Sequence, residues 1–102
     1  MIVISDSTPL MHFGMVGRLD LLQTAYQEIV ITSAVYHETV TEGIKLGEND
    51  ALLIEKETGK WIKIIDPDGN HAEISQRYNI HHGEAASILL AKQLSADLLL
   101  IN

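Results

Sequence analysis

The stretch MIVISDSTPL, residues 1–10, is the part of the sequence that decides the fold. Residues 2–4 are continuously apolar, which predicts a strand buried on both faces. Thr8 and Pro9 then fit the N-cap and the first turn of a helix. Asp6 therefore falls at the carboxyl end of a buried strand, where open α/β sheets place their ligand sites. The structural alternative is an Asp that bonds backbone N–H groups of its own turn, and this stretch alone leaves both open.

The composition predicts one small globular domain. The chain has 102 residues, 46% of them hydrophobic, and no cysteine, which fits a reducing cytoplasm. No apolar run reaches the ~18 residues of a membrane-spanning helix, so no membrane association is expected. The formal net charge of −7 argues against nucleic-acid binding through a broadly basic surface. It leaves room for an enzyme that approaches phosphates through a metal ion held by carboxylates.

Strand-like and helix-like segments alternate along the whole chain. The largely apolar segments 28–31 and 98–101 predict two further buried strands, and the segment 61–65 predicts the third strand of the chain. Strands alternating with helices predict an α/β fold with a parallel sheet and helices on both faces. The intervening helices are expected near residues 8–14, 18–22, 34–42, 49–58, 72–78 and 83–94.

Two glutamates join Asp6 as candidate site residues. Glu38 lies three residues after Val35, so the two share one face of the predicted helix. Glu84 lies in the first turn of the most apolar helix, where the helix dipole favours a carboxylate. Each glutamate has a structural alternative. Glu38 would be an ordinary surface residue at the edge of an amphipathic helix, and Glu84 would only stabilise the N-terminus of its helix.

Two other patterns resemble metal sites and are rejected. Asp66, Asp68 and Asn70 have the spacing of the first calcium-loop ligands, but the required glycine and the closing glutamate are absent. The pair His81-His82 lacks the His-x-x-x-His spacing of a helical metal site. We interpret these histidines as loop residues that can contact substrate.

Three motifs in this order resemble the PIN-domain family of metal-dependent nucleases, which includes VapC-type toxins. They are IVISDSTPL at 2–10, ITSAVYHETV at 31–40 and HGEAASILLAKQLSADLLLIN at 82–102. The closest resemblance is to an uncharacterised PIN-like subgroup. It implies a three-layer α/β/α fold with a mainly parallel four-stranded sheet. The expected strand order is third, second, first, fourth.

The resemblance also implies the site and its chemistry. Asp6, Glu38 and Glu84 match the acids that gather at the carboxyl edge of the sheet, where they would hold Mg²⁺ or Mn²⁺. Ser7 and Thr8 would orient Asp6 or touch phosphate, or else shape the turn with Thr8 as the cap. The implied activity is endoribonuclease hydrolysis of RNA that leaves a 5′-phosphate and a 3′-hydroxyl. Expected partners are the RNA substrate, an antitoxin protein if the chain is a toxin, and a second copy in a homodimer.

One departure from the family pattern keeps other functions open. The family places a further Asp directly after the position of Asn102, followed by a last strand and helix. We therefore expect residues 1–102 to be a single PIN-like domain truncated at its C-terminal end. A catalytically incomplete PIN-like module that binds proteins is the alternative function. A receiver-like domain, with Asp66 as the phosphate acceptor, is a third.

Overall fold

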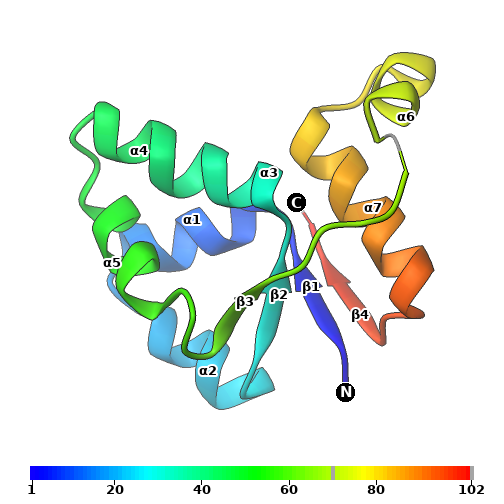
Figure 1. The fold of residues 1–102 in the computed structure, drawn as a ribbon. Coiled ribbons are helices and arrows are strands. Elements are labelled where there is room, and N and C mark those ends of the chain that lie inside the picture. The colour runs from blue at the N-terminus through cyan, green and yellow to red at the C-terminus, as the bar shows by residue number, and fades with distance from the viewer. Residues whose placement is uncertain (70, 102) are drawn as a thin grey trace.

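The strands form one parallel sheet between two layers of helices (Figure 1). The computed structural model describes residues 1–69 and 71–101, with only the backbone of His71. Asn70 of the rejected calcium spacing and Asn102 of the third motif lie outside these residues. The described strands are β1 Val3–Ser5, β2 Ile29–Ile31, β3 Ile62–Ile64 and β4 Leu98–Leu100.

The strand order β3-β2-β1-β4 confirms the order implied by the family resemblance. The strand β1 lies in the centre, with Ile4 opposite Val30 of β2 and Leu99 of β4. All three pairings are parallel, so each connection has to cross over the sheet through helices. The carboxyl ends of β1 and β2 therefore reach the same edge.

Alternate residues of the central strands enter two separate cores. Val3 and Ile31 pack in the larger cluster, against Leu10, Val35 and Ile54 from the helices. Ile4 and Val30 face the other side and pack with Leu90. Both faces of β1 and β2 are thus buried, as the continuous apolar runs predicted.

The helices divide between these two faces. In Figure 1, α1 to α5 lie on one side of the sheet and α6 and α7 on the other. Among the described residues, no helix is both long and apolar enough to span a bilayer. The bounds are α1 Ser7–Met15, α2 Leu19–Tyr26, α3 Ser33–Tyr36, the π-helical turn η1 His37–Thr41, α4 Glu42–Lys45, α5 Asn49–Glu57, α6 His71–Tyr78 and α7 His82–Leu94.

The predicted start of the first helix was wrong. Helix α1 begins at Ser7, and Asp6 rather than Thr8 is its N-cap residue, with extended backbone angles of φ −76° and ψ 177°. Pro9 still fits, because the first four N–H groups of a helix have no partner within the helix. The shift places Asp6 directly at the junction of strand and helix.

The predicted helix over 34–42 contains a π-helical turn. Residues 33–45 form one helical run, with η1 in its middle. Within it, the Thr39 hydroxyl donates to the Val35 carbonyl at 2.8 Å, an arrangement that often bends helices. The π turn carries Glu38, and such turns occur frequently at functional sites.

Thr32→Ala should lower the free energy of unfolding by about 1 kcal/mol. The fully buried Thr32 hydroxyl caps α3 by accepting a hydrogen bond from the Val35 N–H at 3.2 Å. Denaturant unfolding of both proteins measures the difference. Thr24→Ala, at an exposed position of α2, is the control and should change stability far less. Equal effects at the two positions would contradict the capping role.

Candidate active site

Asp6 lies at the centre of the carboxyl edge of the sheet. Its backbone N–H donates to the Leu100 carbonyl of β4 at 2.8 Å, which fixes its position between the two strands. The residue is only 7% exposed. Although Asp6 is the N-cap residue of α1, its side chain makes no capping hydrogen bond. The structure therefore does not show the structural alternative, in which the Asp6 side chain bonds backbone N–H groups of its own turn.

Glu38 reaches this edge from η1. Its Oε2 accepts a hydrogen bond from the Ser7 hydroxyl at 3.0 Å, which ties the start of α1 to the π turn. Its Oε1 is buried and has no hydrogen-bond donor among the described residues. Leaving a buried carboxylate oxygen without a partner is costly. The arrangement therefore suits a ligand that would bind this oxygen.

Gly83 makes the close approach of Glu38 possible. A Cβ atom built on Gly83 would lie 1.9 Å from Glu38 Oε1 and 2.8 Å from its carboxyl carbon. Real Cβ contacts are never this short, so any side chain at position 83 would displace the carboxylate. The Ser87 hydroxyl donates to the Gly83 carbonyl at 2.8 Å and fixes the backbone there.

His81 forms the rim of the site beside Glu38. It is the N-cap residue of α7, and its Nδ1 accepts a hydrogen bond from the Gly83 N–H at 3.4 Å. The same nitrogen lies 3.3 Å from Glu38 Oε1. Capping uses the lone pair of Nδ1, so in the capped form this nitrogen does not donate to Glu38. Oε1 then stays without a donor.

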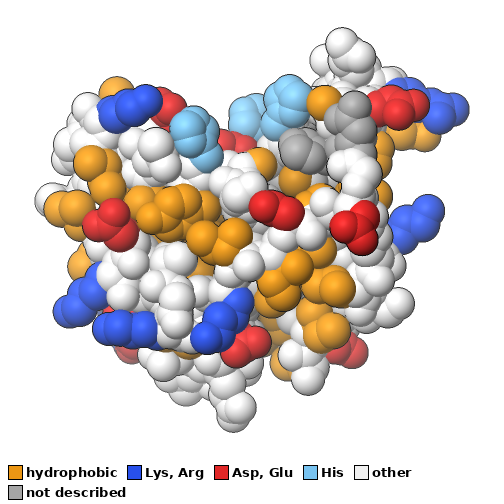
Figure 2. All heavy atoms as spheres, viewed as in Figure 1, with side chains coloured by type: hydrophobic (Ala, Val, Ile, Leu, Met, Phe, Trp, Pro, Cys, Tyr) orange, Lys and Arg blue, Asp and Glu red, His pale blue; other side chains and the backbone are white. Residues whose placement is uncertain are grey.

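All five sequence-predicted site residues line one pocket of about 260 Å³. Asp6 and Glu38 enter it from different segments, and Glu84 adds a third carboxylate from the first turn of α7. Figure 2 shows His side chains around a notch in the upper part of the molecule. The lining residues are Asp6, Ser7, Thr8, Met11, Glu38, His81 and Glu84.

The pocket is not a preformed metal cage. Across the part of the chain that the structure describes, no three His, Asp or Glu side chains are already grouped to bind one ion. Mg²⁺, however, is usually held by one or two carboxylates together with waters and substrate phosphates. Asp6, whose side chain makes no capping hydrogen bond, and the donor-free Oε1 of Glu38 fit that kind of site.

Sequence reasoning missed the parts played by Met11, His81 and Gly83. His81 was assigned to a loop, although it caps α7 and lines the pocket. The sequence could have pointed to Gly83, because glycine in a helix lowers stability by up to about 1 kcal/mol relative to alanine. Such a residue in the first turn of the most apolar helix indicates a close approach by another group.

The receiver-like alternative assigned a chemical role to Asp66. In the structure Asp66 Oδ1 accepts hydrogen bonds from both the N–H and the hydroxyl of Ser33, each at 2.8 Å. This carboxylate therefore stabilises the start of α3. It is not one of the residues that line the pocket.

Comparison with known families identifies the class of protein. A family model described as a PIN domain, DUF3368, matches residues 2–102. The chain belongs to the PIN-domain family, whose members are generally nucleases and typically use divalent metal ions. The match spans all three acids that line the pocket. No curated protein and no solved structure gave a significant match.

Ser7→Ala should lower the free energy of unfolding by about 1–2 kcal/mol, because it removes the donor to a mostly buried carboxylate. In a Glu38→Gln background the same substitution should cost about half as much, since hydrogen bonds to neutral acceptors are weaker. A double-mutant cycle from denaturant unfolding measures this coupling. Strictly additive effects would mean that the hydrogen bond between Ser7 and Glu38 does not stabilise the fold.

Proposed function

We propose that this chain is an endoribonuclease of PIN type that depends on a divalent metal ion and hydrolyses RNA phosphodiester bonds. The observation that carries the proposal is the buried Oε1 of Glu38, which has no hydrogen-bond donor among the described residues, in a pocket that Asp6 and Glu84 also line. A buried carboxylate oxygen without a donor is an unfavourable arrangement for stability alone. It is a favourable one for binding a cation.

Asp6, Glu38 and Glu84 would hold Mg²⁺ or Mn²⁺. When bound, the ion would activate a water molecule and neutralise charge on the phosphate. The chain contributes a preset geometry for its two most constrained acids. Asp6 is held through the Leu100 carbonyl, and Glu38 is held between the Ser7 hydroxyl and Gly83. The Thr8 side chain lines the same pocket and can contact a substrate phosphate.

The overall charge supports a local rather than a general attraction for RNA. With 14 acidic and 7 basic residues, the surface as a whole repels a polyanion. A metal ion in the acidic pocket would reverse the sign of the charge where the scissile phosphate binds. The metal should therefore hold the scissile phosphate in the pocket as well as supply the chemistry.

Cleavage of a 5′-labelled single-stranded RNA by the purified chain tests this proposal. We expect hydrolysis with millimolar Mn²⁺ or Mg²⁺, loss of cleavage in EDTA, and recovery when the metal is restored. Product ends should be a 5′-phosphate and a 3′-hydroxyl. A preparation of the Asp6→Asn variant controls for contaminating nucleases. Equal cleavage by wild type and variant, or cleavage unaffected by EDTA, would contradict the proposal.

The proposal extends to a toxin of a toxin–antitoxin pair, because the family resemblance includes VapC-type toxins. An antitoxin protein and a second copy of the chain would then be its protein partners. Regulated growth arrest on expression in a bacterium, relieved by Asp6→Asn, is the expected result. Growth arrest that persists with the Asp6→Asn variant would show that toxicity does not depend on the candidate active site.

A further inference from the structure

A second hollow lies between α6 and α7, on the helical layer that carries Glu84. Its volume is about 530 Å³. We call this hollow, which is lined by residues of α6, of α7 and of the loop between them, the groove.

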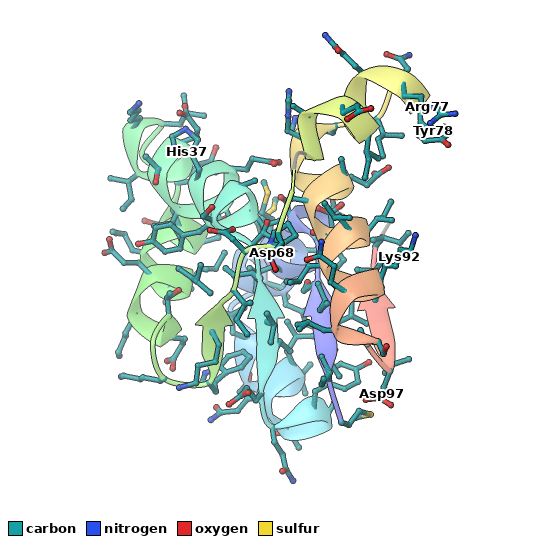
Figure 3. The ribbon with its side chains drawn as sticks, turned by 45° about the vertical axis from the view of Figure 1, so that its right-hand side comes forward. His37, Asp68, Arg77, Tyr78, Lys92 and Asp97 are labelled. Carbon is teal, nitrogen blue, oxygen red and sulfur yellow. The ribbon has the colours of Figure 1, made fainter. Side chains whose placement is uncertain are left out.

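The groove combines an apolar floor with an exposed aromatic ring. Ile74, Ile80 and Ile88 line it, together with Tyr78. Tyr78 is 63% exposed, and the Arg77 guanidinium lies 5.5 Å from the centre of its ring. Figure 3 shows Arg77 and Tyr78 together at the end of α6. Exposed aromatic rings beside arginine are the platforms on which proteins stack the bases of single-stranded nucleic acids.

The charge of the groove differs from that of the chain as a whole. Arg77 and Lys92 both line it, against one acid, Glu73. The groove thus carries one net positive charge in a chain whose formal charge is −7. Two cations beside an apolar floor suit a ligand that presents phosphates and flat rings.

The groove adjoins the candidate active site along α7. Glu84 lines the acidic pocket, whereas Ile88, one turn further along the helix, and Lys92, two turns along, line the groove. Four helical residues span about 6 Å. The groove and the acidic pocket also meet at the loop before α7, where Ile80 lines the groove and its neighbour His81 lines the pocket.

We propose that this groove binds single-stranded RNA on one side of the scissile phosphate. A base stacks on Tyr78, and Arg77 and Lys92 pair with backbone phosphates. The choice of RNA as the ligand rests on the proposed function, since the strand would run from the acidic pocket into the groove. An acidic segment of a partner protein would use the same cations, but it would not need the aromatic face of Tyr78.

Binding of a fluorescein-labelled 12-nucleotide RNA, measured by anisotropy in EDTA at low salt, tests the groove without cleavage. We expect Tyr78→Leu to weaken binding about 10-fold, because leucine is apolar but has no face for stacking. Tyr78→Phe keeps the ring and should bind nearly as wild type does. Arg77→Ala and Lys92→Ala should each make the slope of log K against log salt shallower by about 0.7. Lys45→Ala, an exposed lysine on α4, is the matched control.

Equal binding by Tyr78→Leu and Tyr78→Phe would overturn the stacking site. Poly-glutamate that binds wild type as tightly as the RNA does would overturn it in favour of an acidic polypeptide. Absence of RNA binding by wild type would also overturn it. These outcomes are separate from the nuclease proposal, which fails if metal-dependent cleavage is absent even when the groove binds RNA.

Discussion

Asp6→Asn is expected to reduce RNA cleavage about 1000-fold while leaving the fold intact. The substitution keeps the size of the side chain but removes a negative charge from the pocket. Loss of metal-derived stabilisation of the transition state amounts to several kcal/mol, and each 1.36 kcal/mol is a factor of about ten in rate. Cleavage rates at saturating Mn²⁺ measure the effect.

The same variant should melt at the wild-type temperature or above it in the absence of metal. Asp6 is 7% exposed, and its side chain does not cap α1, so its charge is poorly compensated in the folded state. Mn²⁺ should then raise the melting temperature of wild type more than that of the variant, because it binds only the folded site. Glu55→Gln, at an exposed position of α5, is the control for a lost carboxylate. Full cleavage activity in the Asp6→Asn variant would show that Asp6 is not a catalytic residue.

Gly83→Ala is expected to reduce cleavage about 10- to 100-fold without destabilising the protein. The new Cβ would lie 1.9 Å from Glu38 Oε1, so the Glu38 carboxylate has to move. Displacement of a group by about 1 Å can cost 100-fold in rate. Alanine favours a helix over glycine by up to about 1 kcal/mol, so stability should be unchanged or improved. Thermal unfolding and cleavage assays on the same preparation separate the two effects.

Two further variants make this prediction specific to Glu38. Adding Glu38→Asp to Gly83→Ala shortens the acid and should restore part of the activity that the alanine removes. Gly43→Ala is the contrasting control, because its Cβ would lie 2.7 Å from the Ala51 Cβ in the packed helical layer. That variant should lose stability, while its folded fraction keeps its activity. A Gly83→Ala variant with full activity would show that the close contact does not position Glu38.

The two central strands could be predicted from the sequence because they are buried on both faces. Residues 2–4 and 29–31 are continuously apolar, and the structure places Val3 and Ile4 in opposite cores. The expectation that 98–101 would also be a buried strand was wrong, because Leu98 is exposed and Leu99 and Leu100 are only half-buried. The strand order came from the family resemblance, since periodicity alone does not determine which strands pair. The start of α1 was misplaced by two residues, because Thr8 and Pro9 fit more than one position in the first turn of a helix.

The local details of the candidate site could not be predicted in the same way. A π turn of five residues leaves too short a pattern to be distinguished from an α-helix, so the position of Glu38 in η1 was not readable. The contact between Gly83 and Glu38 joins residues 45 positions apart and depends on how α7 packs beside the π turn. The capping role of His81 was missed because histidine is not a preferred N-cap residue.

The central claim is that Asp6, Glu38 and Glu84 bind one divalent metal ion. Anomalous diffraction from crystals grown with Mn²⁺ tests it most directly. We predict one strong peak within coordination distance of Asp6 and of Glu38 Oε1, with Glu84 bound directly or through water. A pocket without a peak at saturating Mn²⁺, or an ion bound only outside it, would contradict the account.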